Sequence, residues 1–148
     1  MLGYWEDPVR TAETVDREGW MHTGDLATID RDGYARIVGR IKDMVIRGGE
    51  NIYPREIEEW LFQHPAVAEV QVFGVPDARW GEEVCAWVRV KPGAALTDDD
   101  LRQWSRERMA HYKVPRHVVF VDSFPMTVTG KVQKHVMRAA MAERLGQV

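Results

Sequence analysis

Two apolar runs separated by a short loop constrain the fold of this chain most. Residues 67–75 and 83–90 are rich in valine, and the intervening loop contains Pro76 and Gly81. In the second run Val84, Ala86 and Val88 alternate with other residues. A period of two is typical of β-strands, and proline and glycine mark the connection. The two runs therefore predict a pair of strands at the centre of a domain.

Helix signals lie on both sides of this strand pair. Pro54 opens one helix, Thr97 caps the start of a second, and a third begins near Gln133. The third has a modest apolar stripe made of Val132, Val136, Ala139 and Ala140. From Lys42 onward the predicted order is β-α-β-β-α-β-α, in which the first and last strands are residues 44–46 and 117–121. This order predicts a small α+β domain, in which helices pack on a short sheet.

The first 41 residues are not obviously part of that domain. An Asp-Gly turn at 30–33 lies between the apolar runs 26–29 and 34–38, which predicts a β-hairpin. The opening segment has neither a basic stretch nor a long apolar stretch, so we do not expect it to be a signal peptide. Tyr4 and Trp5 have little nearby to cover them. We therefore expect the natural protein to extend upstream.

Composition excludes few classes of protein. The 148 residues suffice for one ordinary domain, or for one domain plus a piece of another. A net charge of -3 gives no global argument for nucleic acid or an anionic membrane. No apolar run approaches the ~20 residues of a membrane span. The single cysteine, Cys85, is expected to be a buried small hydrophobe, and a lone thiol fits a reducing, cytoplasmic location.

Three clusters have side chains suited to chemistry. In residues 22–26, Asp25 can accept two hydrogen bonds from a ribose diol, or it can bond its own backbone as a turn aspartate, which spacing alone favours. In residues 39–43 and 47–51, basic side chains flank a glycine pair. That arrangement can meet a phosphate or a pantetheine-like chain, although a solvated hairpin explains it as well.

The third cluster is the loop 125–131, which ends in Thr-Gly-Lys. Lys131 is a mobile point charge there, suited to oxygens that gain negative charge in a transition state. The spacing of a Walker-type phosphate loop is absent. Taken alone, an ordinary surface lysine is the simpler interpretation.

Together and in this order, the three clusters resemble the adenylate-forming superfamily of acyl-CoA synthetases, adenylation domains and luciferases. The resemblance is carried by Thr23-Gly24-Asp25, by the stretch 39–58 and by Pro125-x-Thr127-x-x-Gly130-Lys131. It covers essentially the whole chain. Residues 47–54 and 110–115 are most similar to the medium- and long-chain fatty acyl-CoA synthetases.

The resemblance implies an acid–thiol ligase that uses ATP, coenzyme A and Mg²⁺. Such enzymes activate a fatty or other carboxylic acid to an acyl-adenylate and then transfer the acyl group to coenzyme A. It also implies roles for individual residues. Asp25, Arg40 and Lys131 would bind the nucleotide, Lys131 would be catalytic and Lys42 would be the hinge. The coenzyme A tunnel would be lined by Gly48, Gly49 and Glu50.

The implied fold is α+β, with a small three-stranded sheet and packed helices, preceded by a β-hairpin. Residues 1–41 would be the end of a large AMP-binding domain, and residues 42–148 a mobile C-terminal lid. The large domain would hold the acyl pocket and most of the Mg²⁺ site, so the chain alone should be inactive. Without that domain, residues 1–41 should be loosely held or pair with another copy. Neither nucleic acid nor a transmembrane segment is expected.

A second hypothesis is a free-standing accessory or regulatory module that binds coenzyme A or a partner protein. A basic cluster near one helix could hold the 3′-phosphate of coenzyme A, although a solvated helix face explains it too. Its members are Arg102, Arg106, Arg108, His111, Lys113 and Arg116. An upstream reading frame that encodes a Ser/Thr-Gly-rich phosphate loop would favour the enzyme hypothesis. A true translation start at Met1 would favour the accessory-module hypothesis.

Overall fold

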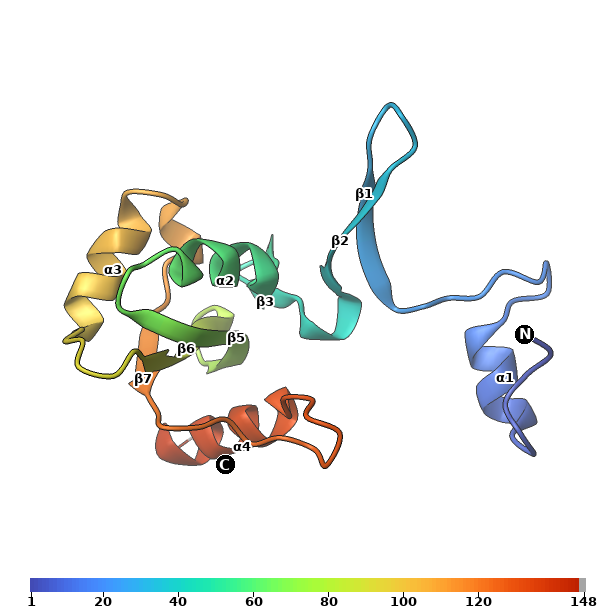
Figure 1. The fold of residues 1–148 in the computed structure, drawn as a ribbon. Coiled ribbons are helices and arrows are strands. Elements are labelled where there is room, and N and C mark those ends of the chain that lie inside the picture. Colours follow the sequence, from blue (N-terminus) through green and yellow to red (C-terminus); the bar gives the residue numbers. More distant parts are fainter. Residues whose placement is uncertain (147–148) are drawn as a thin grey trace. The chain divides into compact units, whose positions relative to one another are not determined.

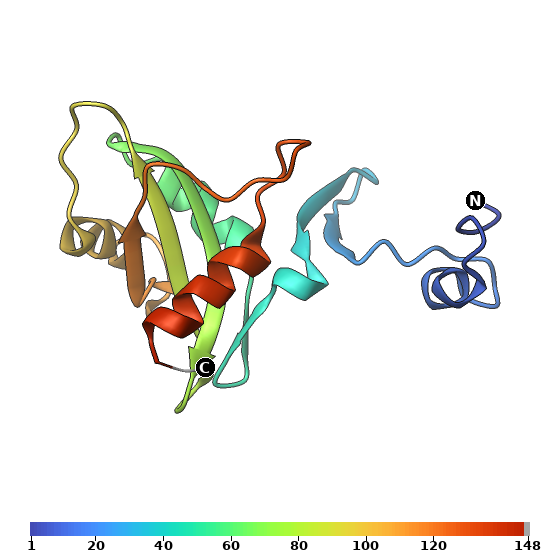
Figure 2. The same cartoon turned by 90° about the horizontal axis from the view of Figure 1, so that it is seen from below.

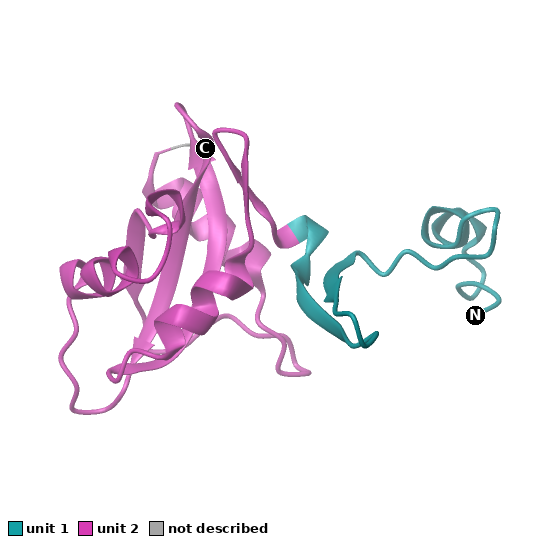
Figure 3. Ribbon diagram, turned by 90° about the horizontal axis from the view of Figure 1, so that it is seen from above, with its two compact units in different colours: residues 1–42 teal, residues 43–148 magenta. Residues whose placement is uncertain are grey.

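The computed structural model of the protein describes residues 1–146. The chain divides into two compact units, residues 1–42 and the remainder from Asp43 onward (Figure 3). Each unit is described by itself below. The predicted α+β class is confirmed by the mixture of helices and sheets.

The first unit contains helix α1 (Pro8–Thr14) and strands β1 (Asp25–Ile29) and β2 (Ala35–Arg40). The two strands pair in antiparallel fashion, so the predicted hairpin is confirmed. Its turn is closed by Asp30, whose Oδ1 accepts hydrogen bonds from the backbone N–H groups of Asp32 and Tyr34 at 3.0 and 2.9 Å. A side chain thus replaces ladder bonds in the tip of the hairpin.

This first unit has no core of its own. None of residues 1–42, all of which the structure describes, is buried. Trp5, Trp20 and Tyr34 are 90%, 71% and 76% exposed, whereas Tyr4 is half-buried under Arg10, whose guanidinium carbon lies 4.3 Å from the ring centroid. Large exposed aromatic side chains commonly mark a surface that another body covers.

The second unit is built on a five-stranded sheet. Its strands are β3 (Val45–Arg47), β4 (Glu50–Ile52), β5 (Val67–Asp77), β6 (Gly81–Val90) and β7 (His117–Phe120). The order is β4-β3-β6-β5, and β7 pairs in parallel with β6. The expected three-stranded sheet was therefore too small. Strand β4 escapes prediction because the Glu-Asn-Ile sequence has no apolar alternation, and it pairs with β3 only because the chain reverses between them.

Helices cover both faces of this sheet (Figure 1). Helices α2 (Pro54–Phe62) and α3 (Asp98–Arg106) lie on one face and α4 (Lys134–Arg144) on the other. Alternate residues of β6 therefore enter two separate cores. One core contains Val84, Ala86, Val88, Ile57, Leu61 and Leu101; the other contains Cys85, Phe73, Phe124, Met137 and Met141.

Local signals set the helix starts as expected. Pro54 is the first residue of α2, and Thr97 caps α3 in a reciprocal capping box with Asp100. Cys85 is fully buried, as predicted, and burial raises the pKa of its thiol to about 12. The thiol is consequently neutral at physiological pH.

The apolar stripe predicted for the last helix is correct at Val132, which packs against the core that contains Cys85, and wrong at its other three positions, which are exposed. Met137 and Met141 are the buried residues of α4, whereas Val136 is 40% exposed. A stripe at 137 and 141 has the same four-residue spacing as one at 136 and 140, but the first series continues to Leu145, which packs against the same core, and the second to Arg144. Polar contacts of neighbouring positions fix the rotation: Lys134 donates to Val72 O at 2.9 Å and Arg138 to Gly74 O at 3.0 Å.

Candidate functional site

Asp25 and Arg40 lie opposite each other at the open end of the β1–β2 hairpin. They are direct partners in the strand register, and Arg40 Nε donates to Asp25 Oδ1 at 3.2 Å. The backbone N–H of Asp25 donates to Thr23 Oγ1 at 3.1 Å, which fixes the turn before β1. The carboxylate keeps acceptor capacity for hydroxyl groups, and the guanidinium keeps donors for a phosphate. The structure thus brings together two of the residues that the sequence assigned to a nucleotide.

Lys42 lies in the short 3₁₀ segment η1 (Ile41–Asp43), which joins β2 to β3. It is exposed, and the two compact units divide immediately after it. The backbone N–H of Ile41 donates to Gly24 O at 2.9 Å, so η1 starts from a fixed point on the hairpin.

The glycine pair forms the tight turn between β3 and β4. Arg47 and Glu50 pair directly across it, and Gly48 and Gly49 have φ angles of +58° and +90°. Two positive φ angles in succession are those of a type I′ hairpin turn, and residues with a Cβ adopt them poorly. We call residues 47–50 the glycine loop.

Lys131 ends a second tight loop, which we call the lysine loop (residues 125–131). Thr127 organises it: its backbone N–H donates to Lys131 O at 2.8 Å, and its Oγ1 accepts from Lys131 N at 3.1 Å. Gly130, with φ +78°, makes the reversal. The Lys131 side chain is exposed and has no hydrogen bond or ion pair with another residue of the described 1–146.

The lysine loop and the glycine loop lie at opposite ends of the second unit. Figure 2 shows the lysine loop, in orange, at one end and the β3–β4 turn at the other, and Figure 3 shows the same arrangement from the other side. One reaction centre cannot face both loops while this unit keeps a single orientation.

Sequence reasoning missed the residues that hold the lysine loop in place. Lys134 Nζ donates to Glu58 Oε1 at 2.8 Å and to Val72 O at 2.9 Å, and Glu58 Oε1 also accepts from Val72 N at 2.8 Å. These contacts satisfy backbone groups on the outer edge of β5 and tie the start of α4 to the sheet. Lys131 and Lys134 are only three residues apart, yet the Lys131 side chain is exposed whereas Lys134 is paired with Glu58 of α2. Because Glu58 is distant in the chain, the spacing of the two lysines does not show which of them is paired.

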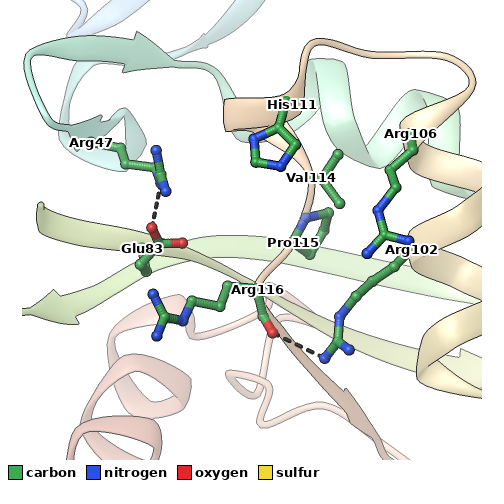
Figure 4. Close-up of a pocket in the computed structure, with 8 residues that line it drawn as sticks. All are labelled: Arg47, Glu83, Arg102, Arg106, His111, Val114, Pro115 and Arg116. Carbon is green, nitrogen blue, oxygen red and sulfur yellow. Dashed lines mark hydrogen bonds and ion pairs between the residues drawn. The ribbon is translucent and has the colours of Figure 1, made fainter.

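The basic cluster divides into two parts in the structure. Lys113 is bound to Glu56, with Nζ 2.6 Å from Oε1, and Arg108 lies over the Trp104 ring at 3.5 Å from its centroid. The other members line a pocket of about 360 Å³ (Figure 4). The full lining is Arg47, Glu83, Arg102, Arg106, His111, Val114, Pro115 and Arg116.

Positive charge in this pocket is only partly neutralised. Arg47 is paired with the buried Glu83, and Arg102 with Asp98 at 3.0 Å. Arg106 and His111 make no side-chain hydrogen bond or ion pair within the described residues. Open donors that converge on a concave surface suit a phosphate or another small anion.

Two features are absent from the part of the chain that the structure describes. In residues 1–146 no three His, Cys, Asp or Glu side chains are grouped as a metal site. No helix in the same range is long and apolar enough to cross a membrane.

Comparison with known proteins places the chain in a family. Residues 56–131, about half of the chain, match the family described as AMP-binding enzyme C-terminal domain. The chain belongs to this family. It is 53% identical to the putative acyl-CoA synthetase YngI of Bacillus subtilis over 143 residues, which is 97% of this chain and 26% of that protein. It is 49% identical over 145 residues to the mitochondrial medium-chain acyl-CoA ligase ACSF2 of Rattus norvegicus, covering 98% of this chain and 24% of that enzyme.

Solved structures give the same result. The crystal structure of ATP-bound MatB from Rhodopseudomonas palustris superimposes with a TM-score of 0.88 at 42% identity, covering 93% of this chain and 27% of that one. The resemblance to adenylate-forming enzymes is therefore confirmed. The chain spans about a quarter of the length of the curated relatives it matches.

Proposed function

We propose that this chain is the C-terminal part of an acyl-CoA synthetase and acts in both of its half-reactions. In the first, a carboxylate oxygen attacks the α-phosphorus of ATP, and pyrophosphate leaves. In the second, the thiol of coenzyme A loses its proton and attacks the acyl carbon, and AMP leaves. The observation that carries the proposal is the placement of the lysine and glycine loops at opposite ends of one unit (Figure 2). Rotation of this unit presents each loop in turn to one reaction centre.

In the adenylation step Lys131 is the catalytic residue. Its ammonium is free of protein partners in the described chain, so it can bind the oxygens on which negative charge develops. The lysine loop is held by Thr127 and anchored through Lys134, which positions the charge before the reaction begins. Asp25 and Arg40 bind the ribose hydroxyls and an adjacent oxygen of the nucleotide. The MatB structure contains bound ATP, which supports ATP as the nucleotide.

In the thioester step the glycine loop lines the path of the pantetheine arm. A Cβ built on Gly49 would meet no atom within 4 Å, so a ligand can approach the backbone there. Arg47 belongs both to this loop and to the pocket with Arg106 and His111, so a thiol arm and a phosphate can bind side by side. Residues of this chain therefore fit coenzyme A. The described residues offer no cluster suited to Mg²⁺, and no step is assigned to a metal here.

Lys42 is the proposed hinge, and residues 1–41 are the proposed end of the large domain. The position of η1 at the junction of the two units supports the hinge, and the exposed aromatic rings of residues 1–41 support a covering body. The accessory-module hypothesis is not favoured, because the relatives are enzymes that also carry this segment. The expected cytoplasmic location and the expected self-association stay predictions, and one relative is named as mitochondrial.

The function is tested by comparing the chain alone with the complete protein that contains it. The complete protein should release pyrophosphate from ATP with a fatty acid and form a thioester when coenzyme A is added. The 148-residue chain should do neither, since Asp25 and Arg40 supply only part of a nucleotide site. A complete protein that binds coenzyme A but releases no pyrophosphate with a broad panel of carboxylic acids would contradict the proposal.

Arg106→Ala tests the coenzyme A pocket. Loss of one charge-assisted contact to a phosphate should raise the KM for coenzyme A by roughly tenfold. The KM for 3′-dephospho-coenzyme A should change little, because the phosphate that Arg106 contacts is missing from it. Arg55→Ala, which removes an exposed arginine paired with Glu59, is the matched control. Equal effects on both coenzymes would show that Arg106 does not bind the 3′-phosphate.

A further inference from the structure

The two glycines of the glycine loop have different surroundings. A Cβ built on Gly48 would lie 2.7 Å from Cε3 of the Trp80 ring, whereas a Cβ on Gly49 would meet nothing within 4 Å. Separations below 3.0 Å essentially do not occur for real Cβ atoms, so the indole ring occupies the space where a side chain at 48 would go. The protein itself therefore covers one glycine and leaves the other open.

Trp80 lies in the turn between β5 and β6 and also holds Gly48 through its backbone. The N–H of Gly48 donates to Trp80 O at 2.8 Å. Adjacent contacts join β3 to β6, the strands next to these two turns: Arg47 is paired with the buried Glu83, and Ile46 N donates to Glu82 Oε2 at 2.8 Å. The glycine loop is thus fastened to the β5–β6 turn along one side.

The ring is held in this orientation by residues of its own turn and by Arg47 of β3. Asp77 Oδ1 accepts hydrogen bonds from the backbone N–H groups of Arg79 and Trp80, each at 2.9 Å. The guanidinium carbons of Arg47 and Arg79 lie 4.8 and 4.6 Å from the indole centroid, within the range of cation–π attraction. Trp80 is therefore fixed before any ligand arrives.

We propose that Trp80 is a positioning residue for the thioester step: its ring braces Gly48 so that the open face of Gly49 is presented to the pantetheine arm. The inference rests on the proposed role of the glycine loop in thioester formation. It assigns different roles to the two glycines: Gly48 allows the Trp80 ring to pack against the loop, and Gly49 allows the ligand to approach the backbone. Trp80 acts through the loop and does not touch the reacting atoms.

The structural half is tested in the 148-residue chain by amide hydrogen exchange. Trp80→Ala should lower the protection of the Gly48 amide by roughly tenfold, because loss of the ring lets the loop open locally. Trp104→Ala is the matched control, since this indole packs near Trp60 and donates to its carbonyl at 3.1 Å, on other elements. Unchanged protection of Gly48 in Trp80→Ala would overturn the inference, whatever the kinetics show.

The functional half is tested in the complete protein by measuring the half-reactions separately. Trp80→Ala should slow transfer from preformed acyl-adenylate to coenzyme A by on the order of tenfold to a hundredfold, because misplacement of about 1 Å costs that much. Pyrophosphate release should be unchanged, and Trp80→Phe should restore most of the transfer rate. A variant that only destabilises the unit would slow both half-reactions together.

The outcomes separate this inference from the proposed function. Reduced Gly48 protection with a normal transfer rate would overturn the positioning role while leaving the ligase activity intact. A wild-type protein that makes acyl-adenylate but no coenzyme A thioester would overturn both. If Trp80→Ala lowers the rates of both half-reactions equally and Trp80→Phe does not restore them, Trp80 contributes only to packing and the positioning role is overturned.

Discussion

Lys131→Ala should slow acyl-adenylate formation in the complete enzyme by on the order of a hundredfold to a thousandfold. The physical reason is the loss of one charge-assisted contact to a transition-state oxygen, which is worth roughly 3–4 kcal/mol. Thioester formation from supplied acyl-adenylate should be nearly unaffected, because in the proposed mechanism the glycine loop, and not Lys131, faces the reaction centre in that step. Pyrophosphate release under single-turnover conditions measures the first effect directly.

The control for Lys131 is another exposed lysine of the same unit. Lys91→Ala removes the same charge from the loop after β6 and should leave both half-reactions unchanged. Thermal unfolding of both variants should match the wild type, since the Lys131 side chain has no partner in the described chain to lose. Normal pyrophosphate release by Lys131→Ala would refute the assignment of Lys131 as the catalytic residue.

Lys42→Pro should separate the half-reactions in the opposite sense. Proline fixes φ near about -65°, so a backbone angle that must change during rotation can no longer do so. We expect adenylation to survive better than thioester formation, which should fall on the order of tenfold to a hundredfold when the unit cannot reach its second orientation. The measurement is the rate of each half-reaction in the complete enzyme.

Lys42→Ala distinguishes the backbone of this residue from its charge. It removes the ammonium group but leaves φ free, so a true hinge should retain both half-reactions. Because a proline at this position also disfavours a helical conformation at Ile41, circular dichroism and thermal unfolding of Lys42→Pro should accompany the kinetics. Loss of both half-reactions to the same extent would point to misfolding rather than to a hinge.

The secondary structure of the second unit followed from local signals. The start of α2 at Pro54 and the capping box at Thr97 depend on a few adjacent residues, and the structure shows both as predicted. The strand pair 67–75 and 83–90 was equally predictable, because two short apolar runs bounded by proline and glycine indicate strands buried on both faces. Strand β4 was not predictable, because its pairing depends on the tight turn at Gly48 and Gly49 rather than on its own composition.

The rotation of α4 depends on both local and distant residues. Residues 136 and 140 have the same spacing as 137 and 141, and the contacts of Lys134 and Arg138 with β5 hold the helix with its methionine face against the sheet. These partners are separated from α4 by 62 and 64 positions in the chain. Met137, Met141 and Leu145 are a local signal for that face, and the two distant partners add contacts that no local window contains.

The sequence by itself determined the family, the fold class and the candidate residues of each motif, because motifs and helix signals consist of residues that are neighbours in the chain. Tertiary structure alone decided what the motifs can do together. It paired Arg40 with Asp25, divided the basic cluster so that Arg106 faces a pocket while Lys113 is bound to Glu56, and set Trp80 against Gly48. Each of these arrangements depends on residues from different elements, and the pairing and packing of the elements, rather than local spacing, bring those residues together.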